Sequence, residues 1–222
     1  VELFDGDGGY IDTRGPNVAG QYQFILGPGN YLLSTSHEVT FHNLINEAWT
    51  SGGGVPCIDD CNPANIGGEG FTVAEGKTFL ANFELDSGLT ISGAITAANG
   101  GLPIGGIEVC AGRTSDGFWV GCTVTQAALN ENGDNYVIKG LVDEGAELEV
   151  FTANMNGQPF VRGSYPGTVL LNGGNAPRID FALDDGRIVS GTLSAGGEPV
   201  HFEGSVTAYD INGNWIDGTG VD

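Results

Sequence analysis

Two stretches of this chain carry oxygen-bearing side chains at the alternating spacing that a bound cation needs. They are Asp5, Asp7 and Asp12 near the N-terminus and Asp210, Asn212, Asn214 and Asp217 near the C-terminus. Calcium takes about six to eight oxygen ligands, and a tight loop of Asp and Asn can supply several of them. The match to an EF-hand fails at the twelfth position, where Pro16 and Val221 stand in place of a bidentate Glu. The alternative interpretation is that Asp, Asn and Gly occur here because they form tight hairpin turns.

The four cysteines fall into two local pairs. Cys110 and Cys122 flank a turn at residues 115–117, and a three-residue loop there places their sulfurs opposite each other on antiparallel strands. Cys57 and Cys61 lie in a loop rich in Gly and Pro. A zinc site is the alternative, but this spacing is not that of zinc ligands, and no His lies nearby in the sequence. We therefore predict two disulfides and an oxidising, extracellular compartment.

The histidines and the short motifs give little sign of an enzyme. His37, His42 and His201 have no Cys or carboxylate partner at metal-ligand spacing. The sequence contains no G-x-S-x-G, HExxH or phosphate-loop pattern. We expect ordinary surface or strand histidines, no catalytic residues and no required cofactor, with calcium as the candidate ion. Because a Ser-His-Asp triad is assembled in space, a hydrolase fragment is kept as a third hypothesis.

Three aromatic residues occupy one position just past a predicted hairpin turn: Tyr10, Trp119 and Trp215. We interpret this as a packing position, with a sugar-stacking platform as the alternative. Trp49 lies outside this pattern, and we therefore name it as the candidate contact for a ligand or a protein partner.

The charge of the chain excludes several classes of partner. There are 28 acidic and 7 basic residues, a formal net charge of −21. Nucleic-acid binding needs clustered Lys and Arg, and anionic membrane surfaces repel such a chain. No apolar run approaches the roughly 20 residues that a membrane helix requires, so no membrane insertion is expected. The acidity fits solubility, salty surroundings or divalent-cation binding.

A repeated pattern of strands underlies these residues. Residues 88–96 and 186–194 alternate apolar and small polar side chains, which predicts half-buried strands that begin a unit. Strands after a polar turn are predicted at 19–24 and 132–138. Strands that end a unit are predicted at 79–86 and 178–184.

The period of the pattern is about 100 residues, with about seven short strands in each unit. It predicts an all-β fold of tandem seven-stranded, Ig-like or transthyretin-like β-sandwiches with partial repeats at both ends. Residues 1–86 form a repeat that lacks its first strands, residues 87–185 a complete repeat, and residues 186–222 the first strands of a third. The first and last 17 residues share six identical positions, which indicates that both ends fall at the same point of the repeat.

Several motifs carry a family resemblance that extends over essentially the whole chain. They are G-L-T-I-S-G-A-I-T at 88–96, G-L-P-I-G-G-I-E-V at 101–109, D-I-N-G-N-W at 210–215, L-G-P-G-N-Y at 26–31 and F-A-L-D-D-G at 181–186. The chain resembles the carboxypeptidase regulatory-like repeats of bacterial surface proteins and the B-type stalk repeats of Gram-positive adhesins. The resemblance implies transthyretin-like sandwiches in secreted or surface-attached proteins, used mainly as stalks, spacers and accessory domains. The insert at 37–70 departs from the bare module. Some adhesin repeats carry a Lys–Asn isopeptide cross-link. Lys77 and Lys139 do not lie on the first strand of a unit, so we expect disulfides in place of that cross-link.

The leading functional hypothesis is an extracellular structural protein: a subunit or segment of a filament, stalk or surface fibre, at the cell surface. Its partners would be copies of itself or further repeats of the same chain. In one version, residues 186–222 of one copy add strands to residues 1–86 of the next. The hairpin shared by both ends counts against simple donation, because it would then be present twice. The alternative is an adhesin or carbohydrate-binding module with a glycan or surface partner.

Overall fold

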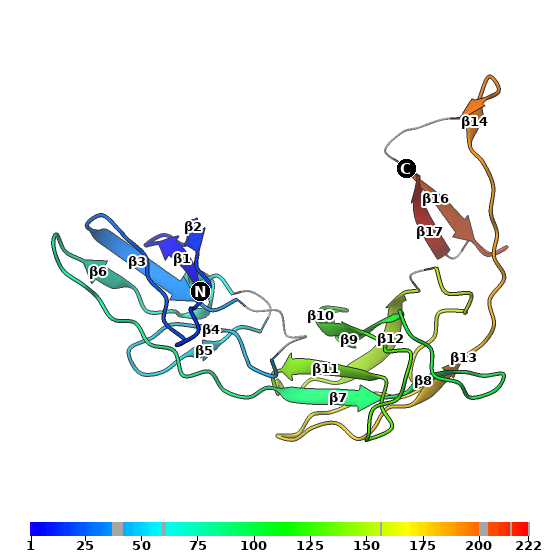
Figure 1. The fold of residues 1–222 in the computed structure, drawn as a ribbon, viewed down its shortest axis with the longest axis horizontal. Helices are drawn as coiled ribbons and strands as arrows, with labels where there is room; N and C mark the ends of the chain where they lie inside the picture. The colour runs from blue at the N-terminus through cyan, green and yellow to red at the C-terminus, as the bar shows by residue number, and fades with distance from the viewer. Residues whose placement is uncertain (37–41, 59–60, 156, 200–203, 214, 222) are drawn as a thin grey trace. The chain divides into compact units, whose positions relative to one another are not determined.

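The computed structural model describes residues 1–36, 42–58, 61–155, 157–199, 204–213 and 215–221. The described chain consists of β-strands and loops with one short helix (Figure 1). It divides into a compact unit, Val1–Gly186, and a smaller one, Arg187–Asp222. The predicted all-β class is therefore confirmed, whereas tandem sandwiches of seven strands stay a prediction.

Residues 1–86 build one antiparallel sheet. Its strands are β1 (Glu2–Asp5), β2 (Tyr10–Thr13), β3 (Gly29–Ser34), β4 (Glu47–Ala48), β5 (Val55–Pro56) and β6 (Phe71–Val73). Their order is β2-β1-β3-β4-β5, and β6 also pairs with β3. The helix α1 (Pro63–Ile66) begins at Asn62, whose side chain accepts a hydrogen bond from the amide of Ala64. It ends at Gly67, in the left-handed conformation that glycine adopts at helix ends.

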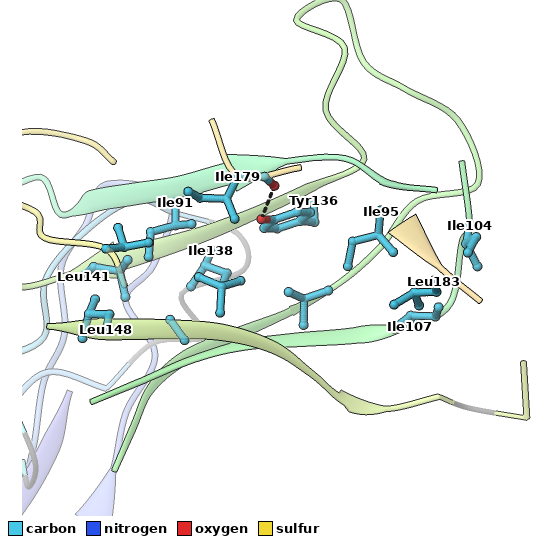
Figure 2. Close-up of a cluster of buried hydrophobic side chains, with 14 of the residues drawn as sticks. Ile91, Ile95, Ile104, Ile107, Tyr136, Ile138, Leu141, Leu148, Ile179 and Leu183 are labelled. Carbon is cyan, nitrogen blue, oxygen red and sulfur yellow. Dashed lines mark hydrogen bonds between the residues drawn. The ribbon is translucent and has the colours of Figure 1, made fainter. Parts of the chain in front are cut away.

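The described part of residues 87–186 contains seven strands in three small sheets. The strands are β7 (Leu89–Gly93), β8 (Ile95–Ala97), β9 (Glu108–Arg113), β10 (Trp119–Val124), β11 (Tyr136–Leu141), β12 (Leu148–Asn154) and β13 (Phe181–Leu183). Strand β9 lies between β10 and β12, β7 pairs antiparallel with β11, and β8 pairs parallel with β13. Apolar side chains from these strands meet in one cluster (Figure 2). Ile91, Ile95, Ile107 and Ile138 are fully buried there, so alternating apolar residues form a sandwich-like core.

The unit Arg187–Asp222 consists of two hairpins. Its strands are β14 (Ser194–Ala195), β15 (Glu198–Pro199), β16 (Gly204–Tyr209) and β17 (Trp215–Val221). Within the described residues, neither hydrophobic cluster includes a member of this unit. The apolar side chains of Ile188 and Val189 are 77% and 95% exposed, so this unit holds apolar residues without a core to bury them.

Three hairpins share one irregularity. In β1–β2, β9–β10 and β16–β17, an aromatic residue pairs across the hairpin, the next residue is left out of the ladder, and pairing resumes one residue later. The bulged residues are Ile11, Val120 and Ile216, directly after Tyr10, Trp119 and Trp215. A β-bulge at one fixed place is a built feature of a strand. The backbone register therefore agrees with the sequence match between the two ends of the chain.

Both predicted disulfides are present, with Cα atoms 4.9 Å apart in Cys57–Cys61 and 4.0 Å apart in Cys110–Cys122. The hairpin turn before Trp119 differs from the prediction. The predicted three-residue loop would place residue 112 opposite residue 120. In the structure residue 112 pairs with Trp119. The bulge at Val120 restores the register, so Cys110 and Cys122 still lie directly opposite each other.

Candidate functional site

A groove of about 870 Å³, lined by both polar and apolar residues, opens in residues 1–86. Its floor is made by core side chains of the sheet: Leu3, Leu33, Phe71 and Val73. Its walls are residues 19–26 on one side and 77–82 on the other. Leu3, Leu33 and Phe71 are buried, so the groove lies directly over the core of this part of the chain.

Both walls have the side-chain alternation of half-buried strands. In residues 21–26 the side chains of Tyr22, Phe24 and Leu26 point into the core while their neighbours are exposed, and residues 80–85 alternate in the same way. The sequence predicts strands at both places. Within the described residues, however, neither wall belongs to a strand or pairs with one. The walls are extended segments with free edges, because no strand lies between them.

A tyrosine hydroxyl joins the two walls. The Oη of Tyr22 donates a hydrogen bond of 2.5 Å to the carbonyl of Ala81. Burial raises the pKa of Tyr22 to about 12, because the phenolate would lose its hydration. The hydroxyl is therefore a neutral donor at any physiological pH, and the bond fixes the separation of the walls.

The same bond occurs in residues 87–186, where a strand fills the equivalent space. Tyr136 donates to the carbonyl of Ile179 at 2.7 Å (Figure 2), and burial raises the pKa of this phenol too. Ile179 lies five residues before Asp184, as Ala81 lies five residues before Asp86. These two tyrosine–carbonyl bonds therefore mark equivalent places in the two parts of the chain.

Strand β7 lies between the two segments that Tyr136 connects. On one side it pairs with β11, with Gly93 opposite Tyr136. On the other side the amide of Ile179 donates to the carbonyl of Ser92 at 2.9 Å, and that of Phe181 donates to Ala94 at 3.1 Å. The space beside a Tyr–carbonyl bond of this kind is thus as wide as one β-strand.

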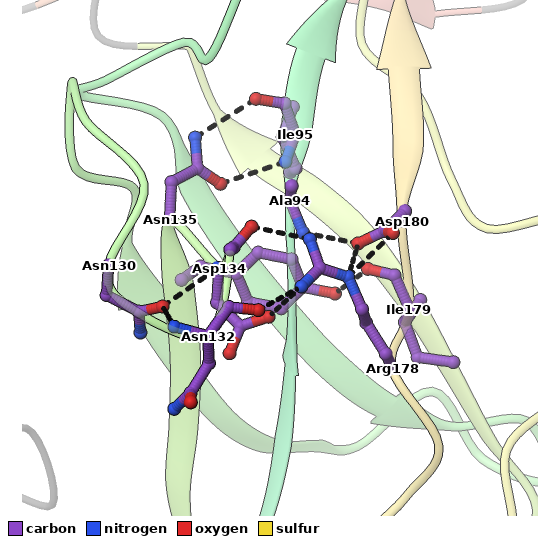
Figure 3. A network of polar contacts seen from close by, with 11 residues as sticks. Ala94, Ile95, Asn130, Asn132, Asp134, Asn135, Arg178, Ile179 and Asp180 are labelled. Atoms are coloured by element: carbon purple, nitrogen blue, oxygen red, sulfur yellow. Dashed lines mark hydrogen bonds and ion pairs between the residues drawn. The ribbon is translucent and has the colours of Figure 1, made fainter.

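Polar side chains hold the strand in this filled space (Figure 3). The Oδ1 of Asp180 accepts the amide of Ala94 at 2.7 Å and also binds Arg178. Asn135 is buried, and its amide both accepts from the nitrogen of Ile95 and donates to its carbonyl. Each polar group named here has a partner, as buried polar groups require.

Two of the seven candidate calcium ligands, Asp5 and Asp210, hold the hairpin turns. The Oδ1 of Asp5 accepts the amides of Asp7 and Gly9 at 3.0 and 2.7 Å, and Asp12 forms an ion pair of 2.7 Å with Arg14. In the C-terminal hairpin, Asp210 accepts the amide of Asn212 at 2.8 Å. Asn214 and the side chain of Asp217 lie outside the described residues. The turn interpretation accounts for Asp5 and Asp210, and calcium binding stays a prediction.

Among the described His, Cys, Asp and Glu residues, one group has metal-ligand atoms close together: Glu108, Cys110 and Cys122. Both cysteines are in a disulfide and are not available as thiolate ligands. His42 is exposed, whereas His37 and His201 lie outside the described residues.

The aromatic residues are placed almost opposite to expectation. Trp49, predicted as a contact residue, is 8% exposed and packs edge-on against Phe71 and Phe79. It is a core residue, because its apolar ring is buried by its neighbours. Tyr10 and Trp119, predicted to pack, are 59% and 54% exposed, and their rings pack edge-on against Phe4 and Phe151. The side chain of Trp215 lies outside the described residues.

Comparison with known proteins identifies no relative: no family model, no curated protein and no solved structure matches the chain. The likeness to surface-protein repeats therefore stays an expectation from sequence motifs. None of the described helices has the length and apolar character needed to cross a bilayer.

Proposed function

We propose that this protein is an extracellular structural protein, a segment or subunit of a stalk, surface fibre or filament built from recurring β-sandwich units. The observation that carries the proposal is a pair of backbone hydrogen bonds at the end of residues 1–86 that recurs at the end of residues 87–186. Where residues 1–86 pass into the following part, the amide of Ile45 donates to the carbonyl of Asp86 at 2.9 Å, and that of Gly88 donates to Asn43 at 3.0 Å.

The same pair of bonds closes residues 87–186, within the unit Val1–Gly186. The amide of Val161 donates to the carbonyl of Asp184 at 2.9 Å, and that of Gly186 donates to Pro159 at 2.8 Å. Asp86 and Asp184 are 98 residues apart (184 − 86), as are Gly88 and Gly186 (186 − 88). At the first place the bonds join residues 1–86 to residues 87–186 and limit bending there, which a load-bearing stalk requires and an accessory domain on a flexible linker does not.

The junction between residues 1–86 and 87–186 is further braced by a side chain. The Oδ1 of Asn43 accepts the amide of Gly140 at 2.8 Å, and its Nδ2 donates to the carbonyl of Gly88 at 2.6 Å. A Cβ on Gly88 would lie 2.5 Å from the Cα of Gly140, so only glycine permits this approach. These contacts support a stiff connection.

The covalent and charge properties support an external location. Two disulfides favour an oxidising compartment. The net charge of −21 favours solubility of a protein exposed to solvent.

Immunogold electron microscopy of intact cells that make the protein tests this proposal. We expect label along extended stalks or fibres outside the cell, and uniform rods in sheared surface material. Label confined to the cell interior, or native material consisting only of compact particles, would contradict the proposal.

A second candidate function, a carbohydrate-binding or adhesive module, is favoured by the exposed rings of Tyr10 and Trp119. Aromatic faces stack on sugar rings. A glycan array with the wild-type chain and Trp119→Ala separates the two functions. Binding of a defined glycan that is lost in the variant would support the adhesive role.

A further inference from the structure

We infer that the groove in residues 1–86 is a docking slot for a β-strand from a second copy of this chain, formed by residues 187–195. The strand would run antiparallel to residues 22–26 and parallel to residues 81–85. Val189 and Leu193 would then take the places that Ile91 and Ile95 hold in residues 87–186. The inference rests on the structural role proposed above and names the partner in it.

The width of the slot supports this inference. Tyr22 and Ala81 are bonded across the groove in the same way as Tyr136 and Ile179. In the second case β7 lies between the bonded segments with hydrogen bonds on both sides. The first slot has the same tyrosine bond, an apolar floor and free edges on both walls, so it is matched to one strand.

The sequence of the donor segment matches the strand that fills the second slot. Residues 186–195 align without a gap on residues 88–97, with Ser-Gly at the same place in both. Ile91 and Ile95 are fully buried in the filled slot. Their counterparts Val189 and Leu193 are 95% and 42% exposed. The donor therefore presents apolar side chains at the spacing of the buried ones, with no core of its own to receive them.

Gly191 is the most specific sign of docking. At its counterpart Gly93, an added Cβ would lie 1.9 Å from the carbonyl oxygen of Ile179, so only glycine fits in the filled slot. At Gly191 an added Cβ would meet nothing within 4 Å. Nothing in the described surroundings of Gly191 requires a glycine. A slot wall with the carbonyl of Ala81 close to this position would require one.

The hydrogen-bonding groups of the walls also correspond. Ala81 and Phe83 correspond in sequence to Ile179 and Phe181, whose amides donate to a carbonyl of β7 and to that of the residue that follows β7. The amides of Ala81 and Phe83 would donate to the carbonyls of Ser190 and Thr192. Asn82 stands in the place of Asp180, so its side-chain oxygen can accept the amide of Thr192.

The donated part is limited to the strand itself. In the acceptor, β1 and β2 already form the hairpin that β9 and β10 form in residues 87–186, with the same bulge. The donor's β16–β17 hairpin therefore stays outside the slot, and its duplication is no obstacle. Donation at one end and acceptance at the other is a head-to-tail interface, which generates open chains of subunits.

Light scattering of the full chain over a range of concentrations tests the inference. The wild type should form multiples of the 22.9 kDa monomer. Gly191→Val should remain monomeric at concentrations about tenfold higher, since a side chain here blocks the approach to Ala81. Gly15→Val is the matched control, because this exposed glycine also has no atom within 4 Å of an added Cβ. It should assemble like the wild type.

The acceptor side is tested with the Gly191→Val chain, whose groove is intact. A fluorescent peptide of residues 186–196 should bind it, the same peptide carrying Gly191→Val should not, and Ala81→Pro in the chain should weaken binding by removing an amide donor. Circular dichroism shows whether the Ala81→Pro chain is folded, and the comparison of the two peptides does not depend on that variant. A wild type that is monomeric throughout, or equal binding of both peptides, would overturn the inference. Peptide binding without fibres on cells would contradict the proposed function but support the docking slot. Fibres without peptide binding would support the proposed function and contradict the docking slot.

Discussion

The hydroxyl of Tyr22 donates to the carbonyl of Ala81, 59 residues further along the chain, and this bond holds together two segments that share no strand pairing in the described structure. The ring is half-buried against the cluster around Leu3 and Leu33. An edge between two unpaired segments is easily opened, so one buried hydrogen bond has a large share in keeping the groove in shape.

Tyr22→Phe is expected to lower the free energy of unfolding by about 1 kcal/mol, because the carbonyl of Ala81 loses its donor. Urea unfolding at neutral pH measures this effect. Tyr31→Phe is the control, since its hydroxyl makes an exposed, local bond to Gly27. Equal stability of the two variants would contradict the role given to Tyr22.

The same residue predicts an alkaline pH dependence. Its pKa is raised to about 12 in the folded protein, against about 10 in an unfolded chain. Because the pKa is higher in the folded protein, the neutral phenol of Tyr22 contributes fully to the free energy of unfolding below about pH 10. This contribution is lost as the pH rises toward about 12. Tyr136 acts in the same direction. Thermal melts between about pH 9 and about pH 11 should therefore show a smaller loss of stability in Tyr22→Phe than in the wild type.

Much of this architecture could be predicted from local sequence pattern. The alternation at residues 88–96 predicts β7 and β8, and the cysteine spacing predicts the pair Cys110–Cys122, because side-chain period and strand register are local properties. The bulge at Val120 does not follow from the pattern, since it depends on a turn one residue longer than the spacing suggests.

The groove itself could not be predicted from the sequence. Alternation of apolar and polar side chains indicates a strand but does not show whether a partner strand is present. Residues 21–26 have the pattern of a strand and extend like one, yet they pair with nothing in the described chain. Trp49 differs from expectation for a related reason: a residue outside the repeat pattern need not be functional, and this one is buried in the core beside Phe71. Both differences concern contacts between segments far apart in sequence.

The buried carboxyl of Glu47 is expected to stabilise the folded protein at acidic pH, where it is protonated. It is 3% exposed, and among the described groups its Oε2 has no hydrogen-bond partner. Its pKa is raised, chiefly by burial and further by the charge of Asp86, while the Asp86 amide at 3.4 Å opposes the shift. A carboxyl with a raised folded pKa favours folding below its unfolded pKa of about 4.3, and this contribution is lost as the pH rises through the folded pKa.

Glu47→Gln should therefore raise the free energy of unfolding at pH 7 by about 1 kcal/mol, because the neutral amide removes a buried charge although its own polar atoms still need partners. The gain should shrink toward about pH 4, where the wild-type carboxyl is protonated. Glu69→Gln is the control of opposite sign, since hydrogen bonds from Ser51 lower the pKa of Glu69. A gain at Glu47 that is equal at both pH values would show that ionisation is not its cause.

The two disulfides should differ in their effect on stability. The Cys110–Cys122 bond closes a longer loop, with a sequence separation of 12 against 4 for Cys57–Cys61. Chain-entropy arguments give about 3 kcal/mol for the first and about 2 kcal/mol for the second. Chemical unfolding of the double variants Cys110→Ala/Cys122→Ala and Cys57→Ala/Cys61→Ala compares them. A larger loss from the shorter loop would indicate that strain or unfolded-state structure, and not loop length, decides.

Asn43 provides the sharpest test of a stiff junction. Asn43→Ala removes the acceptor of the Gly140 amide and the donor to the Gly88 carbonyl, and leaves the backbone bond between Asn43 and Gly88 in place. We expect a loss of about 1 to 3 kcal/mol in unfolding free energy. Hydrogen exchange at the amide of Gly140 should become faster, because its partner is gone.

The matched control for Asn43 is Asn99→Ala, which removes an exposed side-chain bond to Asp185 and should leave stability and exchange at Gly140 unchanged. Small-angle scattering of the same variants reports bending between residues 1–86 and 87–186. A broader distribution of shapes in Asn43→Ala alone would tie stiffness to this side chain. An unchanged distribution, together with unchanged exchange at Gly140, would mean that the backbone bonds at Asp86 and Gly88 hold the junction without it.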